Sequence, residues 1–281
     1  MKVLAISDFH GKFPEKLRKL AKSDEVDLIL ALGDYTGLPE WRPIVIKQLQ
    51  AGRKGKEVPS GEEIIGRKKY KLLLKKDFNA GLEILGELNS IGKPVLIIFG
   101  NGDWYHAFFN EVGKHYENYV KRMKNLKNIN YGKTKVNGIT FVGFGGYMDI
   151  ESFFNKKEWG AEDDEQIKAR LERHNRSKKI LFKILRKTKG ERIFLFHYPP
   201  KGVFDIIKGP KHNPMKGKSA GIKFFADAIK KYNPRLMFCG HMHEYQGAKM
   251  LGKSLVINPG PASEGKCAIV DSESLNVRFY K

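Results

Sequence analysis

Short apolar runs separated by polar stretches with helical periodicity make up most of this chain. The first run, Val3 to Ile6, is followed by a helical pattern over Pro14 to Lys22 and then by a second run, Val26 to Leu32. Runs of this length without polar alternation are typical of strands that are buried on both faces. Two such strands joined by one short helix predict a βαβ unit with parallel pairing.

The same types of segment recur further along the chain. Buried strands are predicted at 94–99, 139–144, 192–196 and 236–239, and short strands alternate over 254–280. Helices are predicted at about 62–88, 104–126, 162–188 and 219–231. Residues 51–61 and 201–218 are expected to be loops because glycine and proline interrupt both segments.

No internal repeat and no linker divides the sequence. We therefore expect a single domain over residues 1–281, with a basic insertion around 40–90 and a Lys/Gly/Pro-rich loop at 201–218. A length of 281 residues with 41% hydrophobic content can form one large core or two smaller ones.

The N-terminus and the cysteines bear on location. The chain reaches an acid at Asp8, too early for the apolar region of a signal peptide, and no run of about 18 apolar residues is present. Cys239 and Cys267 lack the CxxC spacing, and a reduced state is the default for such thiols. We expect a cytoplasmic protein without a membrane partner.

The chain carries a large positive charge. Its 52 basic and 31 acidic residues give a net charge of +21, and ten Lys/Arg stand against three Glu between Lys47 and Lys76. One interpretation is attraction to polyanions such as nucleic acid or nucleotides. A charge-rich composition is equally typical of heat-adapted proteins, and a basic helix face is often simply solvated. Composition leaves both interpretations open.

Polar residues of metal-binding type follow five of the predicted buried strands. Each stands directly after an apolar run and beside a loop glycine or proline. The residues are Asp8 and His10, Asp34, Asn101, His197, and His241 with His243. Because the carboxyl ends of strands in an open α/β sheet face one crevice, we expect these seven side chains to converge.

The types of ligand predict the chemistry. A mixture of imidazoles and carboxylates suits manganese, iron, zinc or nickel better than magnesium, and manganese is our first choice. Seven ligands exceed one tetrahedral shell and fit two divalent ions that share a carboxylate. Paired ions lower the pKa of a bridging water and stabilise an in-line displacement at phosphorus. The sequence therefore predicts hydrolysis of a phosphate ester by a metal-bridging hydroxide.

These motifs, in this order, resemble those of the calcineurin-like metallophosphoesterases. The matching segments are Asp8-Phe9-His10, Gly33-Asp34, Gly100-Asn101-Gly102-Asp103, His197 and Gly240-His241-Met242-His243. The resemblance covers roughly residues 1–265 with insertions. It implies an α/β (α+β) fold, a four-layer αββα sandwich of two mixed β-sheets flanked by helices, with the metal site on the strand-end loops.

The resemblance also implies the role of each ligand. Asp8, His10 and His243 are expected on one metal. Asn101, His197 and His241 are expected on the other, with Asp34 bridging the two. The predicted catalytic residues are Asp34, Asn101 and Asp103.

One position departs from the family pattern. Many members place a histidine directly after the metal-binding asparagine, where it assists the leaving group, but this chain has Gly102 there. His106 and His212 are the alternative proton donors, although each is also readily explained as a surface histidine. Trp104 and Tyr105 stand beside the predicted site, either as its wall or as a platform for bases.

Two classes of function remain at this point. The first is a metal-dependent phosphoesterase, either a phosphodiesterase or a phosphatase, acting on a phosphodiester, a nucleotide or another phosphate ester. The second is a non-catalytic module on the same fold that binds nucleic acid or a protein partner. The complete set of seven ligands favours the enzyme. The sequence does not predict the oligomeric state.

Overall fold

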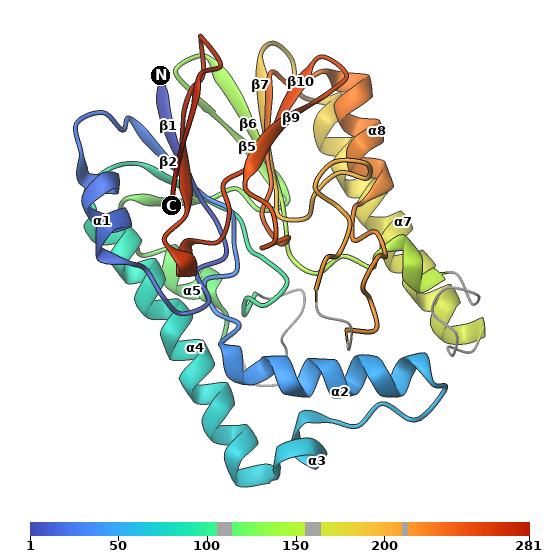
Figure 1. The fold of residues 1–281 in the computed structure, drawn as a ribbon. Coiled ribbons are helices and arrows are strands. Elements are labelled where there is room, and N and C mark those ends of the chain that lie inside the picture. The colour runs from blue at the N-terminus through green and yellow to red at the C-terminus, as the bar shows by residue number, and fades with distance from the viewer. Residues whose placement is uncertain (106–113, 155–163, 210–212) are drawn as a thin grey trace.

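Two six-stranded sheets form the centre of the protein in the computed structural model, which describes residues 1–105, 114–154, 164–209 and 213–281 (Figure 1). The first sheet has the order β12-β11-β1-β2-β3-β4. Its strands are β1 (Lys2–Ile6), β2 (Leu28–Ala31), β3 (Val95–Ile97), β4 (Leu126–Asn128), β11 (Cys267–Asp271) and β12 (Val277–Tyr280). Strands β1 to β4 are parallel, as the βαβ pattern predicts, and β11 and β12 are antiparallel to their neighbours.

The second sheet has the order β5-β6-β7-β8-β10-β9. Its strands are β5 (Gly132–Val136), β6 (Ile139–Phe144), β7 (Arg192–Phe196), β8 (Leu236–Phe238), β9 (Gly247–Leu251) and β10 (Ser254–Asn258). The four central strands, β6, β7, β8 and β10, are parallel, and the two edge strands are antiparallel. Both sheets are therefore mixed.

Helices cover the outer faces of the two sheets. Within the described residues, the α-helices of the protein are α1 (Glu15–Lys22), α2 (Arg42–Arg53), α3 (Gly61–Ile65), α4 (Arg67–Ser90), α5 (Tyr116–Val120), α7 (Asp164–Arg186) and α8 (Lys223–Tyr232). Short 3-10 turns occur at Pro39–Trp41, Glu151–Phe154 and Ala262–Glu264. Helices α1, α4 and α5 share a buried cluster with the first sheet, and α7 and α8 share another with the second. The predicted four-layer αββα sandwich is confirmed.

The central strands are apolar on both faces because each face packs against a different layer. In β1, Leu4 and Ile6 face the helices, whereas Val3 and Ala5 face the second sheet. The cluster between the sheets also contains Phe141 from β6 and side chains from β7 and β8. A continuous apolar run is what a strand between two layers requires.

The helix predicted over about 62–88 is divided in two. Ser60 caps α3 through a capping box, in which its hydroxyl oxygen accepts the Glu63 N–H and its own N–H donates to the Glu63 carboxylate. Gly66, at φ +83°, then separates α3 from α4. Helix α2, which the sequence pattern did not indicate, occupies part of the insertion before them.

The prediction of a helix over about 104–126 is wrong for most of the residues that the structure describes in this range. Within the described residues, only Tyr116–Val120 forms an α-helix there. Leu126 begins β4 and pairs in parallel with Val95 of β3. A run of three residues contains too little periodicity to be recognised, and its strand conformation comes from pairing with a partner distant in sequence.

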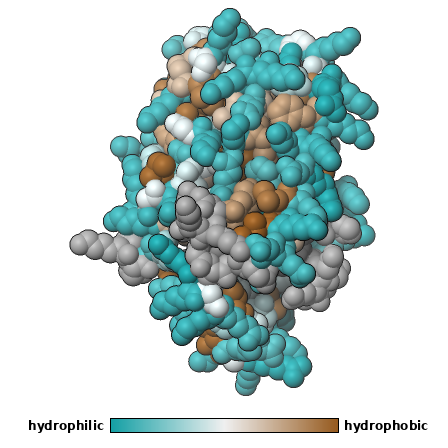
Figure 2. Space-filling model, turned by 90° about the vertical axis from the view of Figure 1, so that its right-hand side faces the viewer, coloured by the Kyte–Doolittle hydropathy of each residue, from teal (hydrophilic) through white to brown (hydrophobic). Residues whose placement is uncertain are grey.

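The other helix and strand predictions agree with the structure to within a few residues at their ends. Within the described ranges, residues 201–218 contain no helix and no extended strand, as predicted. None of the described helices combines the length and the apolar character needed to cross a bilayer. Hydrophilic side chains cover most of the face in Figure 2, and hydrophobic ones show near its middle.

Candidate metal centre

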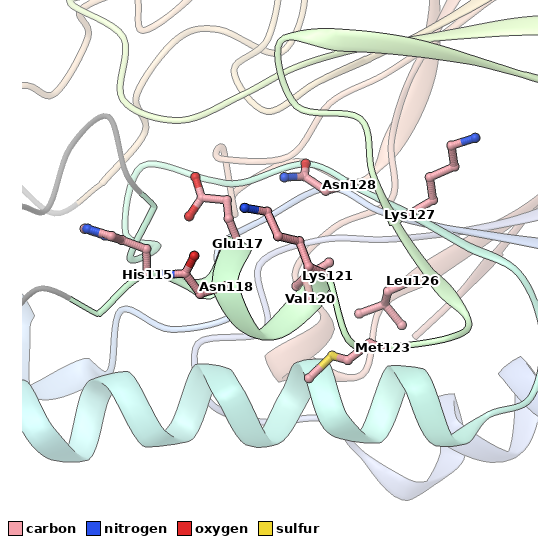
Figure 3. Close-up of a pocket in the computed structure, with 9 residues that line it drawn as sticks. All are labelled: His115, Glu117, Asn118, Val120, Lys121, Met123, Leu126, Lys127 and Asn128. Carbon is pink, nitrogen blue, oxygen red and sulfur yellow. The ribbon is translucent and has the colours of Figure 1, made fainter.

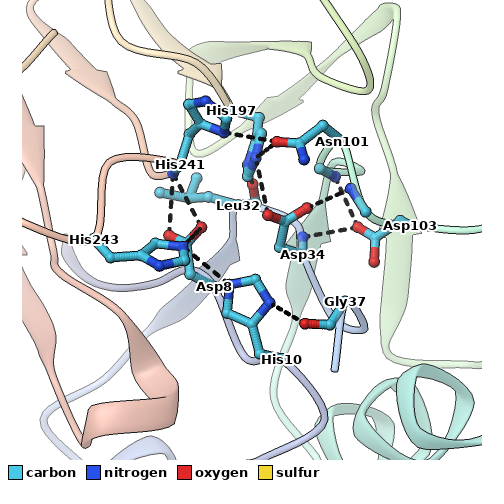
Figure 4. Close-up of polar contacts among 12 residues, drawn as sticks. Asp8, His10, Leu32, Asp34, Gly37, Asn101, Asp103, His197, His241 and His243 are labelled. Carbon is cyan, nitrogen blue, oxygen red and sulfur yellow. Dashed lines mark hydrogen bonds and ion pairs between the residues drawn. The ribbon is translucent and has the colours of Figure 1, made fainter. Parts of the chain in front are cut away.

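All seven predicted ligands lie together at the carboxyl ends of the parallel strands (Figure 4). Three loops come from the first sheet, where β1 is followed by Asp8 and His10, β2 by Asp34, and β3 by Asn101. Two loops come from the second sheet, where β7 is followed by His197 and β8 by His241 and His243. The site is thus built from both sheets, with β1, β2 and β3 in the first and β7 and β8 in the second.

Four of the seven ligand residues have left-handed backbone conformations. Their φ angles are +58° for Asp8, +46° for His10, +53° for Asp34 and +64° for His241. Non-glycine residues rarely adopt this region, and such conformations cluster at functional sites. Each strand therefore turns sharply at its end, which directs the side chain toward the centre of the cluster.

The first ligand group contains Asp8, His10, Asp34 and His243. His10 Nδ1 lies 2.9 Å from the carbonyl oxygen of Gly37, so this nitrogen carries the ring proton and Nε2 presents a lone pair. That Nε2 lies 3.0 Å from His243 Nε2, which is itself 3.2 Å from Asp8 Oδ1. Two imidazole nitrogens and a carboxylate facing one another are suited to a cation.

The second ligand group contains Asp34, His197 and His241, and Asn101 adjoins it. His197 Nδ1 donates to the carbonyl oxygen of Leu32 at 2.9 Å, so its Nε2 points into the cluster, 3.4 Å from Asp34 Oδ2. Asn101 Oδ1 lies 3.1 Å from His197 Nε2 and 2.6 Å from His241 Nδ1. Asp34 belongs to both groups.

The ionisation of these residues reflects their burial beside one another. Burial acts against the charge of Asp8, but His243 outweighs it and lowers the Asp8 pKa to about 2. Burial also opposes the charge on His197, but the adjacent Asp34 carboxylate raises its pKa to about 9. For His241, burial and the nearby His197 lower the pKa to about 3. The cluster therefore contains an ionised Asp8 carboxylate and a neutral His241 imidazole.

Asp103 faces the backbone behind the ligands. Its carboxylate accepts the N–H groups of Asp34, Tyr35 and Gly100 at 2.7–2.8 Å, and that of Thr36 at 3.3 Å. The side chain is fully buried. Burial and the charge of Asp34 raise the pKa of Asp103 to about 8, whereas these backbone donors act in the opposite direction. Asp103 thus joins the loops after β2 and β3.

Glycines allow the ligand loops to approach closely. A Cβ atom on Gly33 would lie 2.2 Å from the backbone nitrogen of Gly100, and Gly33 also has φ +97°. A Cβ atom on Gly240 would lie 1.8 Å from Ser7 Oγ. A Cβ on Gly102 would meet Asp34 Oδ1 at 3.4 Å, an ordinary contact. Position 102 therefore has room for a Cβ atom, whereas positions 33 and 240 do not.

Two residues around the site were not identified from the sequence. Asp77 of α4 is buried and accepts the N–H groups of Gly37 and Leu38 and the indole N–H of Trp104. Tyr198 packs its ring against His241, with ring centroids 3.9 Å apart. Asp77 could not be identified from the sequence because it is one acid within a lysine-rich helix. Tyr198 directly follows the predicted ligand His197, so its position could have indicated a residue of the site.

The remaining candidates from the sequence have different positions. Trp104 and Tyr105 are buried, and Tyr105 stacks on Phe99, so both form part of the wall behind the site. His106 and His212 lie outside the described residues.

A pocket of about 530 Å³ lies elsewhere, beside α5 and β4 (Figure 3). Its described lining includes Glu117, Lys121 and Asn128 and contains none of the seven ligands. The chemistry-bearing residues are concentrated at the strand ends instead.

The donor set fits two cations. Hydrogen bonds to backbone carbonyl groups leave His10 and His197 with a ring nitrogen facing the cluster, and orientation of this kind is typical of ligating histidines. Each ligand group holds at least one carboxylate. The residues that would hold the first ion are Asp8, His10, Asp34 and His243, and those for the second are Asp34, Asn101, His197 and His241.

Comparison with known proteins agrees with this geometry. MJ1162, an uncharacterized protein of Methanocaldococcus jannaschii, is 24% identical over 270 residues, which cover 94% of this chain and 89% of that protein. The crystal structure of TT1561 from Thermus thermophilus shares the fold with a TM-score of 0.56 at 20% identity, covering all of this chain and 98% of that one. A dimetal phosphatase from Danio rerio has a TM-score of 0.50 at 11% identity, with 96% and 91% of the two chains covered.

The family profile described as metallophosphoesterase, calcineurin superfamily, matches residues 1–281. The resemblance inferred from the strand-end motifs is therefore confirmed over the whole length of the sequence. This chain belongs to the metallophosphoesterases of the calcineurin superfamily.

Proposed function

We propose that this protein is a phosphoric ester hydrolase that depends on two divalent metal ions and acts on a phosphodiester or a nucleotide. The observation that carries the proposal is the pair of ligand groups that share Asp34. The similarity in fold to a dimetal phosphatase is in keeping with it. A non-catalytic binding module would have no need for two complete ligand groups, so we favour the enzyme.

Two cations bound here would supply a water of lowered pKa and would neutralise charge at phosphorus. Manganese is our first choice, with iron, zinc or nickel as alternatives, because each group mixes imidazole with carboxylate. Asp34 would hold both ions, and Asn101 would contribute an amide oxygen to the second. His10 and His197 would keep their orientation through the carbonyl groups of Gly37 and Leu32, respectively.

We assign Asp103 to positioning, which changes the catalytic role that the motif suggested. Its carboxylate contacts backbone N–H groups on two ligand loops, and these contacts keep Asp34 and Asn101 at a fixed separation. Gly102 contributes its N–H, which donates to Asp34 Oδ1 at 2.8 Å. This donor holds the shared carboxylate in place.

A cytoplasmic location and a single domain belong to the same proposal. Cys239 and Cys267 are both unpaired and buried, which suits a reducing compartment. The basic surplus of the chain favours an anionic substrate, and nucleotides meet that requirement.

The test combines metal content with turnover in the same preparations. We expect about two metal ions per chain and cleavage of activated aryl phosphodiesters or monoesters. Asp34→Asn should lower the occupancy of both ions and abolish turnover, whereas His10→Ala should mainly empty one. Asp227→Asn, at a half-buried residue of α8 that pairs with Lys223 and belongs to neither ligand group, is the control and should bind metal and turn over substrate as wild type does. A metal-loaded protein that cleaves neither type of ester would overturn the proposal.

A further inference from the structure

A basic arm projects from the two sheets. We use this name for residues 42–76, which comprise α2, α3 and the first part of α4 (Figure 1). Ten Lys/Arg stand against three Glu between Lys47 and Lys76. Within the described residues, the ion pairs of the arm join Arg67 to Glu62 and Lys76 to Glu40. Most of the positive charge of the arm is therefore not neutralised by neighbouring acids.

One face of α4 gathers this charge. Lys68, Lys71, Leu72 and Lys75 have the spacing of a single helical face, and all four are exposed, with Leu72 at 68%. We call these four residues the lysine face. Residues on the opposite side pack inward, where the ring of Tyr70 contacts Gly61 and Trp41, and Leu73 is buried. The lysine face thus points away from the rest of the arm.

The arrangement of these lysines is unfavourable for the isolated helix. Lys71 and Lys75 are four residues apart, as are Arg67 and Lys71, and like charges at this spacing destabilise a helix. The first turn of α4 contains no acid, so its cations also oppose the helix dipole. Heat-adapted proteins typically arrange their charges in ion-pair networks. The lysine face lacks the acids for such a network, and a role in binding anions explains its composition better.

Helix α4 contacts the loop of a predicted metal ligand through the side opposite to the lysine face. Lys75 is two residues from Asp77, whose Oδ1 accepts the N–H groups of Gly37 and Leu38 at 3.1 and 3.0 Å. The carbonyl oxygen of Gly37 in turn lies 2.9 Å from His10 Nδ1. Asp77 lies about half a circle around the helix from the lysine face, so α4 supports a ligand loop with one side and presents its lysines on the other.

We propose that the lysine face binds the phosphate backbone of a nucleic acid strand, as an exosite separate from the metal centre. From Lys68 to Lys75 the helix rises about 10 Å, a length over which a strand presents several phosphates. An anionic membrane is a poorer partner because Leu72 is the sole large apolar residue of the face. The proposal concerns binding alone, so it goes beyond the proposed hydrolysis and does not depend on it.

The test measures binding of a fluorescent single-stranded oligonucleotide by anisotropy at several salt concentrations. A phosphorothioate backbone limits cleavage by metal-loaded protein, and a gel checks that the strand stays intact. The arm variant neutralises the lysine face and the control removes the same charge from exposed lysines of α7. The two triple variants are K68Q/K71Q/K75Q and K178Q/K179Q/K183Q.

We expect wild-type protein to bind with an affinity that falls steeply with salt. The arm variant should bind at least about tenfold more weakly at moderate salt, and its log–log salt slope should be smaller by about 2, since each lost phosphate contact on a single strand removes about 0.7. The control should stay within about threefold of wild type, because a general effect of net charge would weaken both variants alike.

Three results would contradict the proposal that the lysine face is an exosite. They are absence of binding by wild type, equal losses in both variants, and binding of phosphatidylserine vesicles in preference to the oligonucleotide. Circular dichroism melts show whether the variants fold. The binding readout needs no turnover, so an inactive wild-type protein would refute the proposed hydrolysis and leave this test intact.

Discussion

At the scale of single residues, the site depends on side chains whose neighbours determine their protonation and orientation. The seven ligands could be predicted because each follows an apolar run directly, so its position at a strand end is visible in the sequence. Asp77 and Asp103 show the limit of that reasoning. Both act by accepting backbone N–H groups from loops that are distant in sequence, and such partners are defined only once the chain has folded.

Gly102 leads to a prediction about leaving groups. Because this position offers no proton donor, we expect rates that depend steeply on leaving-group pKa, with aryl esters cleaved best. Equal rates on alkyl and aryl esters would contradict this. A Cβ atom fits at position 102, so Gly102→His should make the dependence less steep. Gly102→Ala is the matched control and should keep the wild-type dependence.

His197 leads to a prediction about metal affinity and pH. The pKa of His197 in the metal-free protein is raised to about 9, so its Nε2 carries a proton at neutral pH that a metal ion must displace. Apparent affinity should therefore rise with pH up to about 9, by up to about tenfold per unit where one proton competes. Competition with a chelator between pH 6.5 and 9.5 measures it. A flat profile between pH 7 and 9 would show that metal binding displaces no proton from His197 in this range.

At the scale of elements, tight junctions between strand and loop shape the centre. The strands could be predicted because burial between two layers produces continuous apolar runs. Helix α2 and strand β4 could not. Helix α2 has two buried residues, Ile44 and Gly52, and β4 takes its conformation from β3. Their structure comes from tertiary contacts that local periodicity does not record.

Two glycines provide a matched test of these junctions. Gly33→Ala should destabilise the protein by about 2 kcal/mol or more, because the new Cβ meets the Gly100 backbone at 2.2 Å and the left-handed φ adds about 1 kcal/mol. Gly86→Ala in α4 has nothing within 4 Å and should stabilise it by about 0.5–1 kcal/mol. Urea unfolding measures both. A Gly33→Ala protein as stable as wild type would contradict the close approach seen here.

At the scale of the whole molecule, the metal centre joins the two sheets. Periodicity alone predicted buried strands whose ends converge, while the division into two sheets came from the resemblance to a family. The reason is physical, since a buried strand has the same apolar pattern whichever sheet it joins. The candidate centre takes ligands from both sheets, so metal binding and the association of the sheets are thermodynamically coupled.

This coupling predicts a thermal effect. At a free metal concentration of 100 times Kd, loading stabilises the folded state by about 2.7 kcal/mol per independent site. For a chain of this size, each kcal/mol shifts Tm by about 2–4 °C, so manganese should raise Tm by at least about 5 °C over protein in chelator. Differential scanning calorimetry measures the shift. Asp34→Asn should lose most of it, and an undiminished shift in that variant would place the bound ions elsewhere.

The left-handed conformations of Asp8, His10, Asp34 and His241 have an evolutionary consequence. Glycine or asparagine would occupy the same backbone positions at lower conformational energy. A lineage that no longer needed the metals would therefore lower the conformational energy of these four positions by accepting those residues. The four ligands are thus held in place at the expense of stability.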